Sequence, residues 1–158
     1  QIIKDREIIE DNWTHLDDDS DLIAGNITVS LARWQEQHET LVKHEGELGL
    51  RLSGDDPLEE VVPDLIHFSL IVLVFPAFTD GRCYSFARLL RERYGFKAEI
   101  RAQGDVLYDQ LFYMSQCGIN SFEIANPNRI DKALKAFDDF SEIYQATVLR
   151  PEPLYRRR

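Results

Sequence analysis

The centre of the chain contains the stretch His67-Phe68-Ser69-Leu70-Ile71-Val72-Leu73-Val74-Phe75, which is almost continuously apolar and rich in β-branched residues. A strand buried on both faces has this composition, because no polar residues alternate with its apolar ones. Such strands are typical of parallel sheets covered by helices. The stretch therefore predicts a central parallel strand and an α/β fold.

Strands and helices alternate on either side of this stretch. Short β-branched segments predict further strands at 27–31, 48–52, 97–102 and 121–125. Amphipathic patterns with capping residues predict helices from Trp34 towards Gly46, from Pro57 to Pro63, at 85–94, at 105–117 and from 128 or 129 onwards. We expect about five mainly parallel strands alternating with helices, in either an open sheet or a partial barrel.

The length of 158 residues fits a single domain with one core. We expect this α/β domain to span 1–150, with a hairpin-like N-terminal segment at 1–25 and a core at 26–146. The acidic run 17–21 is too charged for a core element and is expected to form a loop. Residues 151–158 predict an extended basic tail.

The overall charge restricts the partners. A formal charge of −10 disfavours nucleic acids and anionic lipid surfaces, which are themselves negative. The apolar run 70–78 is too short to cross a bilayer, and the first residues lack the pattern of a signal peptide. Two isolated cysteines fit a reducing compartment. These features predict a cytoplasmic protein without a membrane partner, and they leave a homo-oligomer open.

The loops after two predicted neighbouring strands are the best candidates for a binding site. Ligands of parallel α/β proteins bind at the carboxyl ends of strands, beside helix N-termini. The loop at 79–85 contains Thr79-Asp80-Gly81-Arg82-Cys83-Tyr84-Ser85, and the loop at 103–110 begins with Gln103-Gly104-Asp105. We expect these two loops to lie side by side and to bind a small anion.

Each polar residue of these loops has a proposed role. Arg82 can bind an oxyanion with two hydrogen bonds, and Asp80 can act as a general base, so these two are the expected catalytic residues. Gly81 allows an unusual backbone conformation or a close approach to a ligand. The remaining expected ligand-binding residues are Thr79, Tyr84, Ser85, Gln103, Asp105 and Gln110.

A purely structural interpretation of the first loop stays open. Thr79 or Asp80 then caps the following helix, Gly81 relieves the turn, and Arg82 pairs with Asp80 or Asp105. Cys83 stands beside Arg82 near a helix N-terminus, which favours a thiolate, yet its aromatic neighbours favour a small buried thiol.

Motifs for known cofactors are absent from the sequence. It contains neither GxGxxG nor GxxxxGK[ST], so the cofactor is unknown. The four histidines are scattered at positions 15, 38, 44 and 67, and we expect no metal site.

The segment from Phe75 to Phe96 contains Phe-Thr-Asp-Gly-Arg-Cys-Tyr-Ser-Phe-Ala-Arg-Leu-Leu-Arg-Glu-Arg-Tyr-Gly-Phe, and Gly104-Asp105 and Cys117-Gly118 follow. With these motifs the chain resembles a bacterial family of uncharacterised proteins that are encoded beside assimilatory sulfite reductase and are often labelled oxidoreductases. The resemblance extends from Ile2 to Gln145. Cys83 stands where many relatives are expected to have glycine, which argues against catalysis by this thiol.

Three functions follow as hypotheses. The resemblance implies an accessory protein, or an oxidoreductase, of assimilatory sulfite reduction that binds sulfite reductase or its redox partners. The residues alternatively indicate an enzyme or binding protein for a small anionic metabolite at loops 79–85 and 103–110. A flavin- or nicotinamide-dependent reductase is the third, although no cofactor motif supports it. Whether the chain is an enzyme is left open.

Overall fold

The computed structural model describes residues 1–75, 81–106 and 108–149, and the side chains up to residue 139. It is a single α/β domain built on one eight-stranded sheet, with strand order β2-β1-β8-β7-β6-β5-β4-β3. The strands are β1 (Ile2–Lys4), β2 (Glu7–Ile9), β3 (Thr14–His15), β4 (Ile27–Ser30), β5 (Leu48–Ser53), β6 (Leu70–Phe75), β7 (Glu99–Gly104) and β8 (Ser121–Phe122). The sequence prediction of about five strands was therefore too low.

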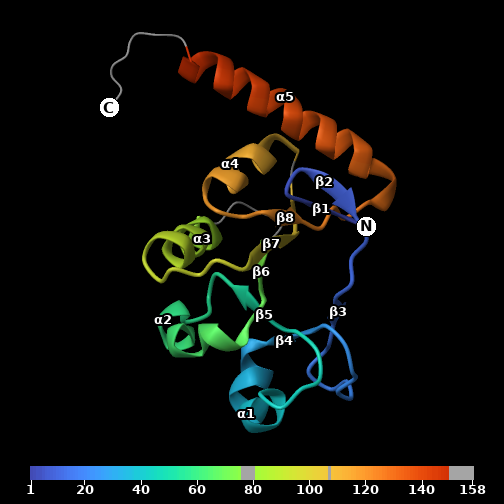
Figure 1. Cartoon of the computed structure of the whole chain (residues 1–158), viewed down its shortest axis with the longest axis vertical. Helices are drawn as coiled ribbons and strands as arrows, with labels where there is room; N and C mark the ends of the chain where they lie inside the picture. Colours follow the sequence, from blue (N-terminus) through green and yellow to red (C-terminus); the bar gives the residue numbers. More distant parts are fainter. Residues whose placement is uncertain (76–80, 107, 150–158) are drawn as a thin grey trace.

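The helices follow the predicted alternation. They are α1 (Leu31–Leu41), α2 (Leu58–Val61), α3 (Arg82–Glu92), α4 (Leu111–Gln116) and α5 (Ile130–Leu149), with 3₁₀ turns η1 (Val62–His67), η2 (Tyr108–Gln110) and η3 (Pro127–Arg129). Helices α1, α2 and α3 lie on one side of the sheet, and α5 lies across the end that carries β1 and β2 (Figure 1). Among the described residues, no helix combines the length and the apolar character that crossing a bilayer requires.

Strands β3 to β8 are parallel, and the N-terminal hairpin is antiparallel to them. β1 pairs with β8 and with β2. The turn between β1 and β2 consists of Asp5 and Arg6, both with positive φ, which is the geometry of a two-residue hairpin turn. The predicted N-terminal hairpin is thus confirmed, but it extends the main sheet instead of standing apart. β3 is a short parallel strand at the opposite edge that the sequence prediction missed.

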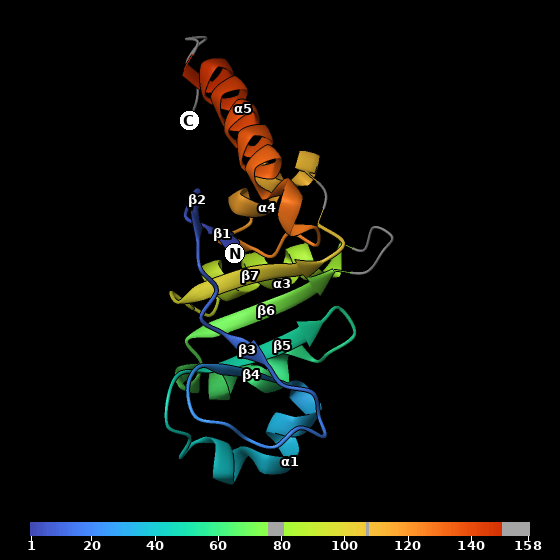
Figure 2. The same cartoon turned by 90° about the vertical axis from the view of Figure 1, so that its right-hand side faces the viewer.

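The sheet is open and curled into a half-barrel. β3 and β8 have four strands between them in the sheet order, yet the side chain of His15 in β3 reaches that of Glu123, directly after β8. The segment between β2 and β3 passes across the face of the sheet that the helices leave uncovered (Figure 2). The half-barrel therefore has an apolar outer face under the helices and an inner face closed by this segment.

Alternation along the strands assigns the side chains to the two faces. Ile71 and Leu73 of β6 and Ile100 and Ala102 of β7 belong to the apolar core on the helix side, and all four are fully buried. Leu70 and Val72 of β6 are equally buried on the inner face. The prediction that β6 is apolar on both faces is confirmed, and it explains why this strand lies in the middle of the sheet.

Among the predicted boundaries that were wrong, two helix starts bear on the candidate site. The predicted helix 105–117 starts later, because the backbone amide of Asp105 donates to the carbonyl oxygen of Phe75 at 3.1 Å and thus continues the β6–β7 pairing. Asp105 is therefore no helix cap, and only η2 and α4 form. Helix α3 begins at Arg82, three residues before the predicted start. The predicted tail 151–158 lies outside the described residues.

Candidate functional site

The two predicted loops start side by side at the carboxyl ends of β6 and β7. Phe75 pairs with Gly104 in the last register position of these strands. Gly104 has a φ of +99°, and a Cβ there would lie 2.3 Å from the carbonyl oxygen of Phe75. Only glycine tolerates this conformation and this close approach. The geometry places Gly81–Ser85, Asp105 and Gln110 at the carboxyl ends of these two strands.

The residues of the first loop are only partly described. Thr79 and Asp80 lie outside the described residues. Gly81 is the N-cap of α3 with a φ of −72°, so the expected unusual backbone conformation is absent at this residue. The Arg82 side chain is 56% exposed, and its Nη1 donates to Oδ1 of Asp55 at 2.6 Å. Asp55 follows β5, so this partner of Arg82 is neither Asp80 nor Asp105.

Tyr84 and Gln110 connect the two loops. The Tyr84 hydroxyl donates to Oε1 of Gln110, and the Tyr84 ring packs between those of Phe75 and Tyr113. Burial, followed by smaller charge effects, raises the pKa of Tyr84 and keeps its phenol protonated. Ser85 is exposed. Tyr84 and Gln110 are thus brought together as expected.

Cys83 and Gln103 point away from this edge. Cys83 is fully buried, and its thiol donates to the carbonyl oxygen of Val74 at 3.4 Å, which favours the interpretation as a core residue. Gln103 lies on the inner face of the half-barrel, where its amide donates to Oε1 of Glu123 at 3.1 Å. Helix α3 packs on the other face, so Gln103 is separated from Arg82 by the sheet. Asp105 is exposed.

The inner face carries a charged cluster that the sequence analysis did not predict. At its centre is Arg101 of β7, whose side chain is only 1% exposed. It donates to Oε2 of Glu99 at 2.9 Å, to Oδ1 of Asp11 at 3.1 Å and to Oε2 of Glu123 at 3.2 Å. Three carboxylates therefore surround one buried guanidinium, which satisfies the general requirement that buried charges be paired.

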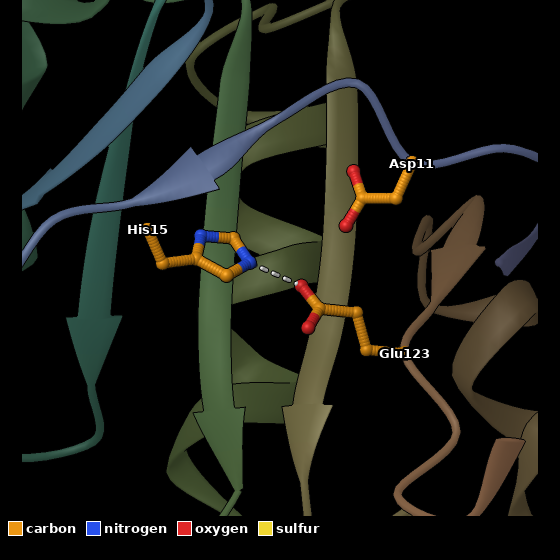
Figure 3. Close-up of side chains that lie close together, drawn as sticks. All are labelled: Asp11, His15 and Glu123. Atoms are coloured by element: carbon orange, nitrogen blue, oxygen red, sulfur yellow. Dashed lines mark hydrogen bonds and ion pairs between the residues drawn. The ribbon is translucent and has the colours of Figure 1, made fainter. Parts of the chain in front are cut away.

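His15 of β3 connects this cluster to the strands at the β3 end of the sheet. Its Nε2 donates to Oε2 of Glu123 at 2.7 Å, and its Nδ1 lies 2.7 Å from the hydroxyl oxygen of the buried Thr28. Arg51 donates to the same hydroxyl at 2.6 Å. Figure 3 shows the His15 ring facing the carboxylate of Glu123, with the carboxylate of Asp11 near both. Side chains from β3, β4, β5, β7 and the end of β8 thus meet inside the half-barrel.

The cluster keeps Glu99 and Glu123 ionised. Burial alone would raise the pKa of Glu123, but the hydrogen bond and charge of His15, the Gln103 amide and the charge of Arg101 outweigh it and lower that pKa to about 2. For Glu99, burial is likewise outweighed by Ser121, Arg101 and Lys4, so its pKa is also lowered. Burial opposes the charge of Arg101, yet the surrounding carboxylates raise its pKa.

The ligand atoms of Asp11, His15 and Glu123 lie within 4.8 Å of one another, close enough to consider a metal ion. Nη1 of Arg101, however, already binds one oxygen of Asp11 and one oxygen of Glu123. A dication about 4 Å from a guanidinium is repelled by roughly 8 kcal/mol at an effective dielectric constant near 20. The geometry therefore supports an ion-pair network in which Arg101 takes the place of a metal ion.

Part of this cluster had a visible sequence signal. Glu99, Arg101 and Gln103 alternate with apolar residues, and Arg101 is in register with Ser121 of β8. This pattern predicts one polar strand face, but it does not distinguish an outer surface from the inside of a curled sheet. The contact of His15 with Glu123 joins residues 108 positions apart, and no local sequence pattern predicts it.

Comparison with known proteins identifies the family over residues 49–155, from β5 to beyond α5, which is more than half of the chain. The chain belongs to DUF934, a family of bacterial proteins of unknown function. No functionally curated protein matches the chain significantly, and no solved structure does either. The part matched to DUF934 contains Arg82, Arg101 and Glu123, whereas Asp11 and His15 precede it. The expected membership of an uncharacterised bacterial family is therefore confirmed.

Proposed function

We propose that this DUF934 protein is an accessory protein of assimilatory sulfite reduction that binds a small oxyanion at the carboxyl ends of β6 and β7. The observation that carries the oxyanion site is the position of Arg82, an exposed guanidinium in the first turn of α3 beside the end of the central strand. The sulfite-reduction role rests on the sequence resemblance.

The N-terminus of α3 suits an anion in two respects. Among the described residues, the first turn of this helix contains no acidic side chain, and its N-cap is Gly81, which has no side chain to occupy the first amides. The helix dipole and the guanidinium of Arg82 therefore act in the same direction on a negative ligand. Arg82 can also donate two parallel hydrogen bonds to one oxyanion.

The ion pair between Arg82 and Asp55 does not prevent this binding. The Asp55 side chain is 81% exposed, and an ion pair as exposed as this one contributes only about 0–1 kcal/mol. An oxyanion that also contacts the helix amides can thus displace the carboxylate. Tyr84 and Gln110, hydrogen bonded to each other, hold the neighbouring loop next to the site.

A nuclear magnetic resonance titration with sulfite and with sulfate tests the site. We expect saturable shifts of the amide signals of Gly81 to Ser85, and at least about tenfold weaker binding in Arg82→Gln, because the charge-assisted contacts are lost. Arg88→Gln is the matched control, since Arg88 is an exposed arginine farther along the same helix. Sodium chloride at equal ionic strength should leave these amide signals in place. Equal affinity of Arg82→Gln and Arg88→Gln for sulfite and sulfate would contradict the site.

The accessory role requires a separate experiment. The tagged full-length chain is used as bait in cells that grow with sulfate as their sulfur source, and we expect enrichment of sulfite reductase or of its redox partners. Bait carrying Arg82→Gln shows whether the association depends on the oxyanion site. The absence of any enrichment would contradict the accessory role while leaving anion binding to be judged by the titration.

A further inference from the structure

A cavity of about 490 Å³ lies at the carboxyl ends of β7 and β8, away from Arg82. Its walls come from the segment after β7, with Val106, Tyr108 and Asp109, and from the segment after β8, with Ile124, Ala125 and Asn126. Arg129 of η3 completes it. Volumes of this size are typical of sites for small organic molecules, and this edge of a parallel sheet is where such sites form.

The floor of the cavity is apolar. Val106, Tyr108 and Ile124 are partly buried and pack against the hydrophobic core. Ala125 adds a small side chain to the lining. These residues favour a ligand with a flat apolar body, since covering them removes apolar surface from water.

Arg129 supplies a positive charge at this cavity. Its guanidinium lies over the ring of Tyr108, 5.5 Å from the ring centroid, and it has no carboxylate partner in the part of the chain that the structure describes. By contrast, Arg6 pairs with Asp138, and Arg101 is surrounded by carboxylates. The stacking on Tyr108 restricts the guanidinium without neutralising its charge. Arg129 thus remains able to bind an anion.

We propose that this cavity binds a small organic monocarboxylate whose flat apolar body rests on Val106, Tyr108 and Ile124 and whose carboxylate pairs with Arg129. The Asn126 side-chain amide, on the same wall, can donate a further hydrogen bond. Asp109 lies on the opposite segment and disfavours ligands with more than one negative charge. This inference uses none of the side chains of the proposed oxyanion site and does not depend on it.

Titration of the full-length chain with benzoate tests the assignment, with binding followed by the amide signals. We expect saturable shifts at Val106, Tyr108, Ile124, Ala125 and Asn126, while Gly81 to Ser85 stay unchanged. Benzamide has the same shape without the charge and should bind at least about tenfold more weakly, because it lacks the ion pair with Arg129. Benzamidine, the cationic analogue, should bind more weakly still.

Two variants separate this site from general attraction of anions. Arg129→Gln should weaken benzoate binding about tenfold or more, whereas Arg93→Gln should leave it within about twofold. Arg93 is the matched control, since it is also an exposed arginine stacked on a tyrosine, Tyr94, at 5.9 Å. Unchanged thermal unfolding of both variants shows that the fold is intact. Shifts that never saturate, equal loss in both variants, or tighter binding of benzamidine would each overturn the proposal.

Discussion

Single charged residues inside the half-barrel depend on their partners to remain ionised. Glu123 is the clearest example, because three different side chains (His15, Gln103 and Arg101) donate to its two oxygens. Its side chain is 21% exposed, so these contacts are only partly screened by water. The low pKa of this carboxyl group is therefore a contribution of the folded state to stability, and it depends on pH.

Glu123 is expected to stabilise the protein above the ordinary pKa of a glutamate. The folded state lowers this pKa from 4.5 to about 2, which corresponds to roughly 3 kcal/mol at neutral pH. The contribution is fully present above about pH 5 and is lost as the pH falls towards 2. Urea denaturation of the native protein and of Glu123→Gln should therefore show a stability difference that shrinks over this range.

The control for this pH dependence is Asp19→Asn, because Asp19 is an exposed carboxylate of the acidic loop. Its removal should change the unfolding free energy by less than about 0.5 kcal/mol at any pH. A difference between native protein and Glu123→Gln that stays constant from pH 7 to pH 2 would show that Glu123 does not titrate as described.

The central elements were the predictable part of the fold. The segments that became β4, β5, β6 and β7 carry either β-branched runs or regular alternation, and each was predicted to within about three residues. β8 keeps only two residues, and β3 consists of Thr14 and His15, too short for any periodicity. Such strands form because a neighbouring strand offers hydrogen bonds, which is tertiary information.

The candidate site was predictable where it depends on strand order alone. Two loops that follow neighbouring parallel strands must share an edge, and Tyr84 and Gln110 meet there. The direction of Gln103 was not foreseen: Ile100 and Ala102, which alternate with it along β7, belong to the apolar core, so Gln103 lies on the opposite face. The pairing of Arg82 with Asp55 was also missed, since it joins loops of different strands.

The end of β7 depends on Gly104, and Gly104→Ala tests this dependence. The added Cβ would lie 2.3 Å from the Phe75 carbonyl oxygen at a φ of +99°, so we expect a loss of about 2 kcal/mol or more. Gly81→Ala is the matched control, because φ is −72° and no atom of the described residues lies within 4 Å of the new Cβ. It should be neutral or stabilising by up to about 1 kcal/mol. Equal thermal unfolding of the two variants would contradict the close packing of β6 against β7.

The inner face of the half-barrel is closed by contacts between distant parts of the chain. An open sheet with helices on one face leaves the other face to water unless something covers it. Here the segment from Glu10 to Asn26 covers it, and its polar anchors are Asp11 to Arg101, His15 to Glu123 and the Leu16 carbonyl to Arg51. A charged interior favours one arrangement of the chain, because each buried hydrogen-bond donor must lie next to an acceptor. The N-terminal segment thus belongs to the fold, although it precedes the part matched to DUF934.

Arg101→Met should test this charged interior. Without the guanidinium, Asp11, Glu99 and Glu123 each lose an ion pair, and breaking a buried ion pair costs about 3–5 kcal/mol at neutral pH. The guanidinium helps to lower the folded pKa values of Glu99 and Glu123 and stabilises only their ionised forms, so the loss should be largest at pH 7 and should decrease as the pH falls towards 2. Arg91→Met provides the control: Arg91 is half-buried and donates to the carbonyls of Phe96, Ala98 and Gly118, which do not titrate. Its cost should remain constant over the same pH range, and a parallel pH profile for both variants would mean that the carboxylates around Arg101 are not coupled through it.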